Sequence, residues 1–168
     1  MEKARKEFGL STELIMCFLR HLDEISAFQT LEKALKYKDL IIGVGLDSSE
    51  LGNPPEKFKN VFAKAKSEGF KLVAHAGEEG PADYIWDTIN LLQIDRIDYG
   101  NKCLEDEDLV STLREKQLAL TLCPLSNYKL KVVSDLSKYP IRKMMQKALL
   151  VCINSDDPAY FGGCLLYT

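Results

Sequence analysis

Apolar runs alternate along the chain with longer segments in which apolar residues recur at helical spacing. Within the runs, aliphatic and β-branched residues follow one another with few polar breaks, which is typical of buried strands in parallel sheets. The predicted strands are residues 14–19, 40–46, 71–74, 96–99, 118–123 and 149–153. Strands and helices that alternate in this way predict an α/β fold with a parallel sheet.

The segments between the predicted strands carry helix signals. Ser26 is the expected N-cap of a helix over residues 27–37. The apolar face of this helix is formed by Phe28, Leu31 and Leu35. The other predicted helices are residues 2–8, 54–68, 82–92, 107–116 and 141–148, and a pair of prolines begins the second of them.

Chemically distinctive residues lie directly after predicted strands. His75 follows the strand at 71–74, Glu78 comes three positions later, and Asp156 and Asp157 follow the last strand. Because the carboxyl ends of parallel strands meet at one edge, we expect these side chains to lie close together, as in barrel enzymes. Each also has a structural interpretation when taken alone. The histidine would be a hydrogen-bonded strand-end residue, and the aspartates would form a turn or a helix N-cap.

Other polar or reactive residues have structural interpretations. Residues 48–50 (Ser-Ser-Glu) are predicted to be a capping segment, and Ser126 and Asn127 are predicted to be turn residues. Cys123 is interpreted as a core thiol, and Trp86 as a core aromatic residue.

Composition and charge exclude several classes of protein. The formal net charge is −3 and the charges are interspersed, so no nucleic-acid partner and no anionic membrane surface is expected. The five cysteines are odd in number and widely spaced, which indicates neither a disulfide framework nor a CxxC metal site. The chain starts with polar residues, and neither a signal peptide nor a membrane span is predicted. The expected location is the cytoplasm, with the nucleus as an alternative.

Several strand-end motifs together resemble those of the zinc-dependent adenosine and adenine deaminases. They are HAGEE at 75–79, RIDYG at 96–100, CPLSN at 123–127 and SDDPAYFGG at 155–163. The segment GVGLDSSE at 43–50 and the CPLSN motif are more similar to the adenine deaminase branch than to the adenosine branch. The resemblance implies a (β/α)8 TIM barrel, of which residues 1–168 supply strands three to eight as a single partial deaminase domain.

The resemblance also implies a reaction and roles for individual residues. The reaction is the hydrolytic deamination of adenine to hypoxanthine and ammonia in purine salvage. His75 and Asp156 are implied zinc ligands, Glu78 is implied to protonate the purine ring, and Asp157 is implied to hydrogen-bond the purine. One Zn²⁺ ion, which lowers the pKa of bound water to about 7, and a small purine substrate are therefore the expected partners.

The sequence departs from the family pattern at the expected site. Tyr99 occupies the position of the family histidine that orients the attacking water. A phenol, whose ordinary pKa is about 10, does not accept a proton at neutral pH as an imidazole does. The family's HxH motif, which supplies two further zinc ligands, has no counterpart, because the only histidines are His21 and His75. Other interpretations are therefore an adenosine deaminase, a catalytically inactive deaminase-like remnant, or a metal-free barrel fragment with an unrelated binding role.

Overall fold

The computed structural model describes residues 2–162, and these contain a parallel sheet of six strands. The strands are β1 (Leu14–Leu19), β2 (Ile41–Asp47), β3 (Lys71–Ala76), β4 (Arg96–Tyr99), β5 (Ala119–Leu122) and β6 (Val151–Ile153). They lie side by side in the order of the sequence, and every neighbouring pair is parallel. This is the strand order of a β/α barrel wall. The predicted parallel α/β class is confirmed.

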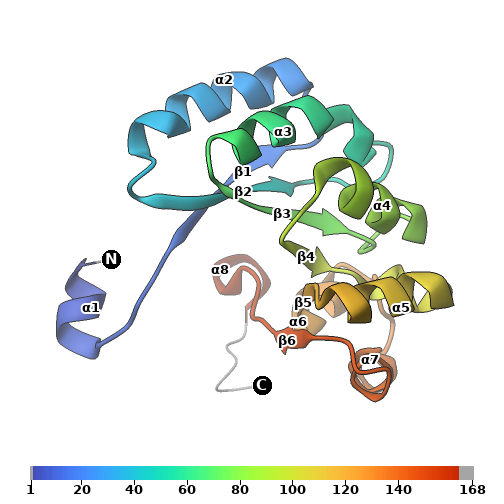
Figure 1. Ribbon diagram of the computed structural model, residues 1–168. Coiled ribbons are helices and arrows are strands. Elements are labelled where there is room, and N and C mark those ends of the chain that lie inside the picture. Colours follow the sequence, from blue (N-terminus) through green and yellow to red (C-terminus); the bar gives the residue numbers. More distant parts are fainter. Residues whose placement is uncertain (1, 163–168) are drawn as a thin grey trace.

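Helices fill the connections between the strands. The α-helices between β1 and β6 are α2 (Glu24–Ala34), α3 (Lys59–Ser67), α4 (Ala82–Asp87), α5 (Glu107–Lys116), α6 (Pro124–Lys129) and α7 (Ile141–Gln146). Shorter turns are η1 (Leu35–Tyr37), η2 (Pro55–Phe58), η3 (Thr88–Leu92), η4 (Asn101–Glu105) and η5 (Leu136–Lys138). Figure 1 shows α2 to α5 along one face of the sheet, with α8 (Pro158–Phe161) on the other side. Helix α1 (Glu2–Phe8) stands apart and has no buried residue.

The two faces of the sheet differ in polarity. Ala74, Ile97 and Leu120 are fully buried on the face that the helices cover. The neighbouring row on the opposite face is polar, because His75 pairs with Asp98 and Asp98 with Thr121. Since side chains alternate between the faces of a strand, the helices cover an apolar core while a polar surface lines the inner side of the curved sheet.

Several predicted boundaries differ from the structure. Asp23, rather than Ser26, caps α2, because the Asp23 carboxylate accepts a hydrogen bond from the Ser26 amide at 2.8 Å. Ser126 and Asn127 were predicted to be turn residues but lie in α6, which begins at Pro124. Proline is favoured at the first position of a helix, where its missing N–H has no partner to lose.

Two strands also have different limits from those predicted. Strand β3 continues to Ala76, so that His75 lies within the strand rather than after it. Strand β6 begins at Val151 rather than 149, because Ala148 has a left-handed φ of +56° and the Leu149 amide still bonds to the Met144 carbonyl. Gly163 of the last motif and Cys164 lie outside the described residues.

The sheet ends in two edge strands, β1 and β6. Leu14 and Leu19 of β1 are about half exposed, and so is Ile153 of β6. No helix within residues 2–162 combines the length and the hydropathy that a bilayer span requires.

Candidate active site

A cavity of about 340 Å³ opens at the carboxyl ends of β3 to β6. Its walls are formed by His75, Arg96, Asp98, Tyr99, Thr121, Cys123, Asn154, Ser155 and Asp156. The structure thus brings together three of the residues singled out in the sequence, His75, Tyr99 and Asp156. Cys123 is buried, as predicted, but it also contributes to the cavity wall.

Tyr99 joins the two predicted metal ligands. Its hydroxyl donates a hydrogen bond to Asp156 Oδ2 at 2.9 Å, and its ring meets the His75 ring edge-on with centroids 4.8 Å apart. Strict alternation along β4 would place Tyr99 on the same face as Ile97. The backbone of Tyr99 instead has a φ of +71°, which breaks the alternation and directs the side chain to the cavity. This left-handed conformation is uncommon for a bulky residue. His75 and Asp156 therefore lie on the same rim of the sheet.

Asp47, at the end of β2, contacts the His75 imidazole. The His75 Nε2 atom lies 3.1 Å from Asp47 Oδ1, and the two side chains are 20% and 34% exposed. Burial lowers the pKa of His75, but the hydrogen bond and charge of Asp47 outweigh it, so the pKa is raised. Burial raises the pKa of Asp47, whereas the His75 contact lowers it below its ordinary value. The pair is therefore favoured in its charged form.

The charge pair makes stability depend on pH. The raised pKa of His75 stabilises the fold below about pH 6.5, and this contribution is lost as the pH rises through the folded-state pKa. The lowered pKa of Asp47 stabilises the fold above about pH 4, and this contribution is lost as the pH falls through the folded-state pKa. We expect Asp47→Asn to lower the pKa of His75 and to remove about 1 kcal/mol of stability near pH 5–6.

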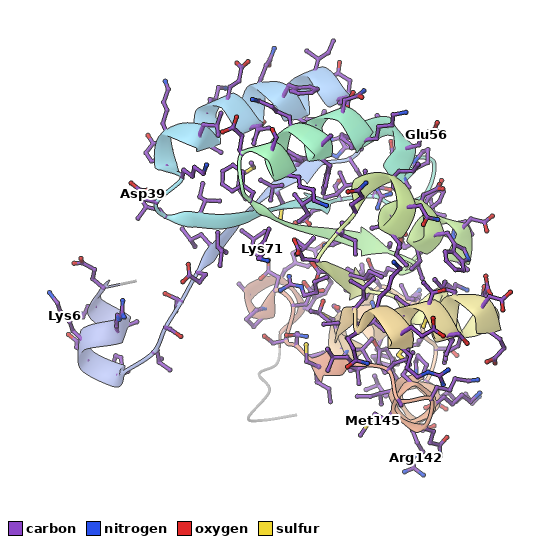
Figure 2. The ribbon with its side chains drawn as sticks, in the orientation of Figure 1. Lys6, Asp39, Glu56, Lys71, Arg142 and Met145 are labelled. Atoms are coloured by element: carbon purple, nitrogen blue, oxygen red, sulfur yellow. The ribbon has the colours of Figure 1, made fainter. Side chains whose placement is uncertain are left out.

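An NMR titration of the His75 imidazole, together with urea unfolding at pH 5.5 and 8.5, measures both effects. Asp39→Asn is the matched control, because Asp39 (labelled in Figure 2) is exposed in the turn before β2, at the opposite end of that strand from Asp47. An unchanged His75 pKa in Asp47→Asn would show that the contact does not control the imidazole.

Glu78 lies in the loop after β3 and is only 7% exposed. Its Oε1 atom accepts a hydrogen bond from the Asn127 side-chain amide at 2.7 Å. Burial raises the pKa of Glu78 to about 7, although the charge of His75 opposes the shift. A carboxyl with such a pKa is partly protonated at neutral pH, which suits a general acid.

Glu50 holds the loop that carries Glu78. It is 1% exposed, and its carboxylate accepts hydrogen bonds from consecutive backbone amides at 2.6–3.0 Å. These amides belong to Gly77, Glu78, Glu79 and Gly80. The segment 48–50 was predicted to cap a following helix, and for Glu50 this was wrong. The signal available in the sequence was a glutamate three positions after the end of β2, but its partners lie 27 or more positions away.

Arg20, at the end of β1, is fully buried. Its Nη1 donates to the His75 carbonyl at 2.8 Å, and its Nε and Nη2 donate to the Asn53 carbonyl at 2.9 and 2.6 Å. In the sequence, Arg20 is a polar residue directly after the predicted strand at 14–19 and belongs to none of the motifs. The structure shows that it ties the end of β1 to the backbone of the predicted metal ligand.

Removal of the Arg20 guanidinium should destabilise the fold. We expect Arg20→Met to lower the free energy of unfolding by about 2–3 kcal/mol, because two backbone carbonyls lose charged donors. Urea unfolding measures the change. Arg142→Met is the control, since Arg142 projects from α7 into solvent (Figure 2). Equal effects of the two substitutions would contradict a structural role for Arg20.

Asp157 is placed differently from the expectation. Its Oδ1 accepts hydrogen bonds from the Ala159 and Tyr160 amides, both at 3.0 Å, so it is the N-cap of α8. It is exposed and is not among the residues that line the cavity. The helix-cap interpretation of this motif therefore applies to Asp157, and a contact with substrate stays a prediction.

The donors at this edge have the chemistry of a divalent-metal site. His75 supplies an imidazole nitrogen, and Asp156 supplies a carboxylate to the same cavity. Within residues 2–162, however, no group of three or more His, Cys, Asp or Glu side chains is arranged to hold a metal ion. The described residues thus offer two ligands of the right type, while a catalytic zinc ion usually has about three from the protein.

All of the chain, residues 1–168, matches the family model described as adenosine deaminase. The chain belongs to the adenosine deaminase family. Among curated members of the family, it is 58% identical over 165 residues to an adenine deaminase of Rhodospirillum rubrum, covering 98% of this chain and 49% of that protein. It is 59% identical over 161 residues to an adenine deaminase of Zymomonas mobilis, covering 96% and 48%. The chain therefore spans about half the length of these curated relatives.

Two solved structures have the same arrangement as this chain. An adenine deaminase from Arthrobacter aurescens superimposes with a TM-score of 0.93 at 48% identity, covering 96% of this chain and 50% of that one. An amidohydrolase from B. ambifaria with bound Zn superimposes with a TM-score of 0.89 at 28% identity, covering 96% and 46%. The predicted barrel type is confirmed, with six strands in the described part of this chain. The family and the zinc-bound neighbour imply a divalent metal at this kind of site.

Proposed function

We propose that this chain is part of a zinc-dependent adenine deaminase, which converts adenine and water to hypoxanthine and ammonia in purine salvage. The observation that carries the proposal is the placement of His75, Tyr99 and Asp156 around one cavity, with the buried acid Glu78 on the loop that follows His75. Relatives named adenine deaminase, at 53–59% identity over nearly the whole chain, support this choice of substrate. A cytoplasmic location stays a prediction.

Each side chain would have its own role in this reaction. His75 and Asp156 would hold the zinc ion, which when bound supplies the Lewis acidity needed to activate water at neutral pH. Glu78, with its pKa raised to about 7, would give its proton to the purine ring nitrogen beside the carbon that is attacked. Asp157 would hydrogen-bond the purine, which requires it to exchange its contacts with the start of α8 for a contact with substrate.

A catalytically inactive, deaminase-like remnant is the second candidate. Burial and the neighbouring carboxylates raise the pKa of Tyr99 far above its ordinary value, so this phenol cannot act as a base at neutral pH. Its hydroxyl also occupies Asp156 Oδ2, one of the two carboxylate oxygens through which Asp156 would hold a metal ion. Tyr99→His is expected to raise zinc-dependent ammonia release by about tenfold or more if the chain is an enzyme. Tyr99→Phe, which also frees Asp156 but adds no base, is the control.

The direct experiment is to load the purified chain with zinc and to measure metal content and ammonia release with adenine and with adenosine. Ammonia release from adenine in preference to adenosine is the expected result. Preference for adenosine would overturn the choice of substrate. Bound zinc without ammonia release, both before and after Tyr99→His, would favour the inactive remnant.

A further inference from the structure

Asn127 lies at the centre of a buried polar network behind Glu78. It is fully buried in α6, and its Nδ2 donates to Glu78 Oε1 at 2.7 Å. Its Oδ1 accepts a hydrogen bond from Asn101 Nδ2 at 2.7 Å and shares the one proton of the Tyr139 hydroxyl, 3.0 Å away, with Asn101 Oδ1, which lies 3.1 Å from that hydroxyl. The network thus joins the connections that follow β3, β4 and β5.

The two donors on Oδ1 determine which way the Asn127 amide points. A carboxamide accepts only through its oxygen and donates only through its nitrogen. With the Asn101 amide donating to the oxygen and the Tyr139 hydroxyl on the same side, the nitrogen faces Glu78. Tyr139 is itself only 7% exposed. Within residues 2–162, no buried side-chain nitrogen or oxygen lacks a hydrogen-bond partner, so this arrangement is complete.

We propose that Asn127 is a positioning residue that determines which oxygen of Glu78 carries the acid proton. This inference depends on the proposed function, in which Glu78 is the proton donor. Because Oε1 accepts from Asn127, the proton of the neutral acid resides on Oε2, the oxygen that remains free to donate. When the Oε2–H bond breaks and the purine N–H bond forms, the negative charge stays on Glu78. The Asn127 N–H then bonds to a charged carboxylate, where hydrogen bonds are stronger.

Other ionisable groups also act on the Glu78 carboxyl and have to be held constant in any test. The charged or titratable neighbours are His75, Glu50, Glu79 and Asp156, with Lys102 and Lys131 beside a second cavity of about 240 Å³ that Glu78 itself lines. Tyr99, Tyr139 and Cys123 also interact electrostatically with Glu78, and burial raises the pKa of each. Substitution of Asn127 leaves all of these residues in place, and Tyr139→Phe removes only a hydroxyl whose raised pKa keeps it uncharged near neutral pH.

The test is a ¹³C NMR titration of the Glu78 side-chain carboxyl, with Glu78→Gln used to assign the signal. In Asn127→Asp, a carboxylate oxygen replaces the N–H donor, and we expect the pKa of Glu78 to rise by about one unit or more. In Tyr139→Phe, Asn127 loses one of the two groups that orient it, and we expect a smaller rise. Asn60→Asp is the matched control for Asn127→Asp. Asn60 Nδ2 also donates to a glutamate, Glu24, at 3.1 Å, but on the exposed surface.

The outcomes separate this inference from the proposed function. An unchanged Glu78 pKa in folded Asn127→Asp overturns the role of Asn127, even if the chain releases ammonia from adenine. If Asn127→Asp does not fold, an unchanged Glu78 pKa in Tyr139→Phe overturns the role of Asn127 instead. A raised pKa in a zinc-loaded chain that never releases ammonia supports the hydrogen bond but overturns the enzymatic function. In an active chain, the pH profile of kcat should move with the Glu78 pKa, and a merely structural role would not move it.

Discussion

Glu50→Ala is expected to lower the free energy of unfolding by about 4–5 kcal/mol. The substitution removes the acceptor of backbone amides in the loop 77–80, and three of these hydrogen bonds are buried. A buried amide without an acceptor costs about 1–3 kcal/mol, and water can reach only part of this loop. Urea unfolding of the wild-type and substituted chains measures the difference.

Two comparisons show whether this loss is specific. Glu79→Ala removes a neighbouring but exposed glutamate, and we expect a change of less than about 0.5 kcal/mol. Glu50→Gln keeps the size but aims an N–H donor at backbone donors, so it should also be strongly destabilising. Because the charge of Glu50 acts on buried Arg20, the double variant Glu50→Ala/Arg20→Met should lose less than the sum of the single losses. A Glu50→Ala chain with wild-type stability would contradict the anchoring role.

Glu78→Gln is expected to reduce zinc-dependent ammonia release from adenine by about 10²–10⁴-fold. Glutamine has the shape of glutamate and can still accept the Asn127 hydrogen bond, but it carries no acidic proton. The loss should therefore appear in kcat, with little change in KM, since binding of the ground state is largely retained. Steady-state ammonia release measures both parameters.

The matched control for Glu78→Gln is Glu79→Gln in the same loop. Glu79 is exposed and Glu78 is buried, so equal losses in the two variants would mean that the loop, rather than the acid, is required. Wild-type kcat in Glu78→Gln would show that another group protonates the purine.

The position of the site could be predicted from the sequence because of a general property of parallel sheets. Apolar runs placed the six strands within a few residues, and the residues after them had to meet at one edge. His75 and Asp156 therefore belonged together before any distance was known, and they do line one cavity. Tyr99 was recognised only through the family motif, because strand alternation alone would have placed it with the core.

The residues that support the site could not be predicted in the same way. Asp47, Glu50 and Arg20 looked like ordinary polar residues at strand ends. Their partners are 27–55 positions away along the chain, and no local pattern records such a pairing. Asn127 was missed for a further reason: a serine and an asparagine shortly after a predicted strand indicated a turn, whereas in the structure both residues lie in helix α6.

By itself, the sequence determined the strands, the edge at which chemistry is possible and the family of the chain, because each of these follows from local periodicity or contiguous motifs. Only the tertiary structure decided which carboxylates are buried and which donors they face. That information depends on how distant segments pack, as when the amide of Asn127 meets the carboxyl of Glu78 from 49 positions away. Burial and the hydrogen-bond partner together set the acidity of Glu78, so its chemistry is a property of the fold rather than of the motif that contains it.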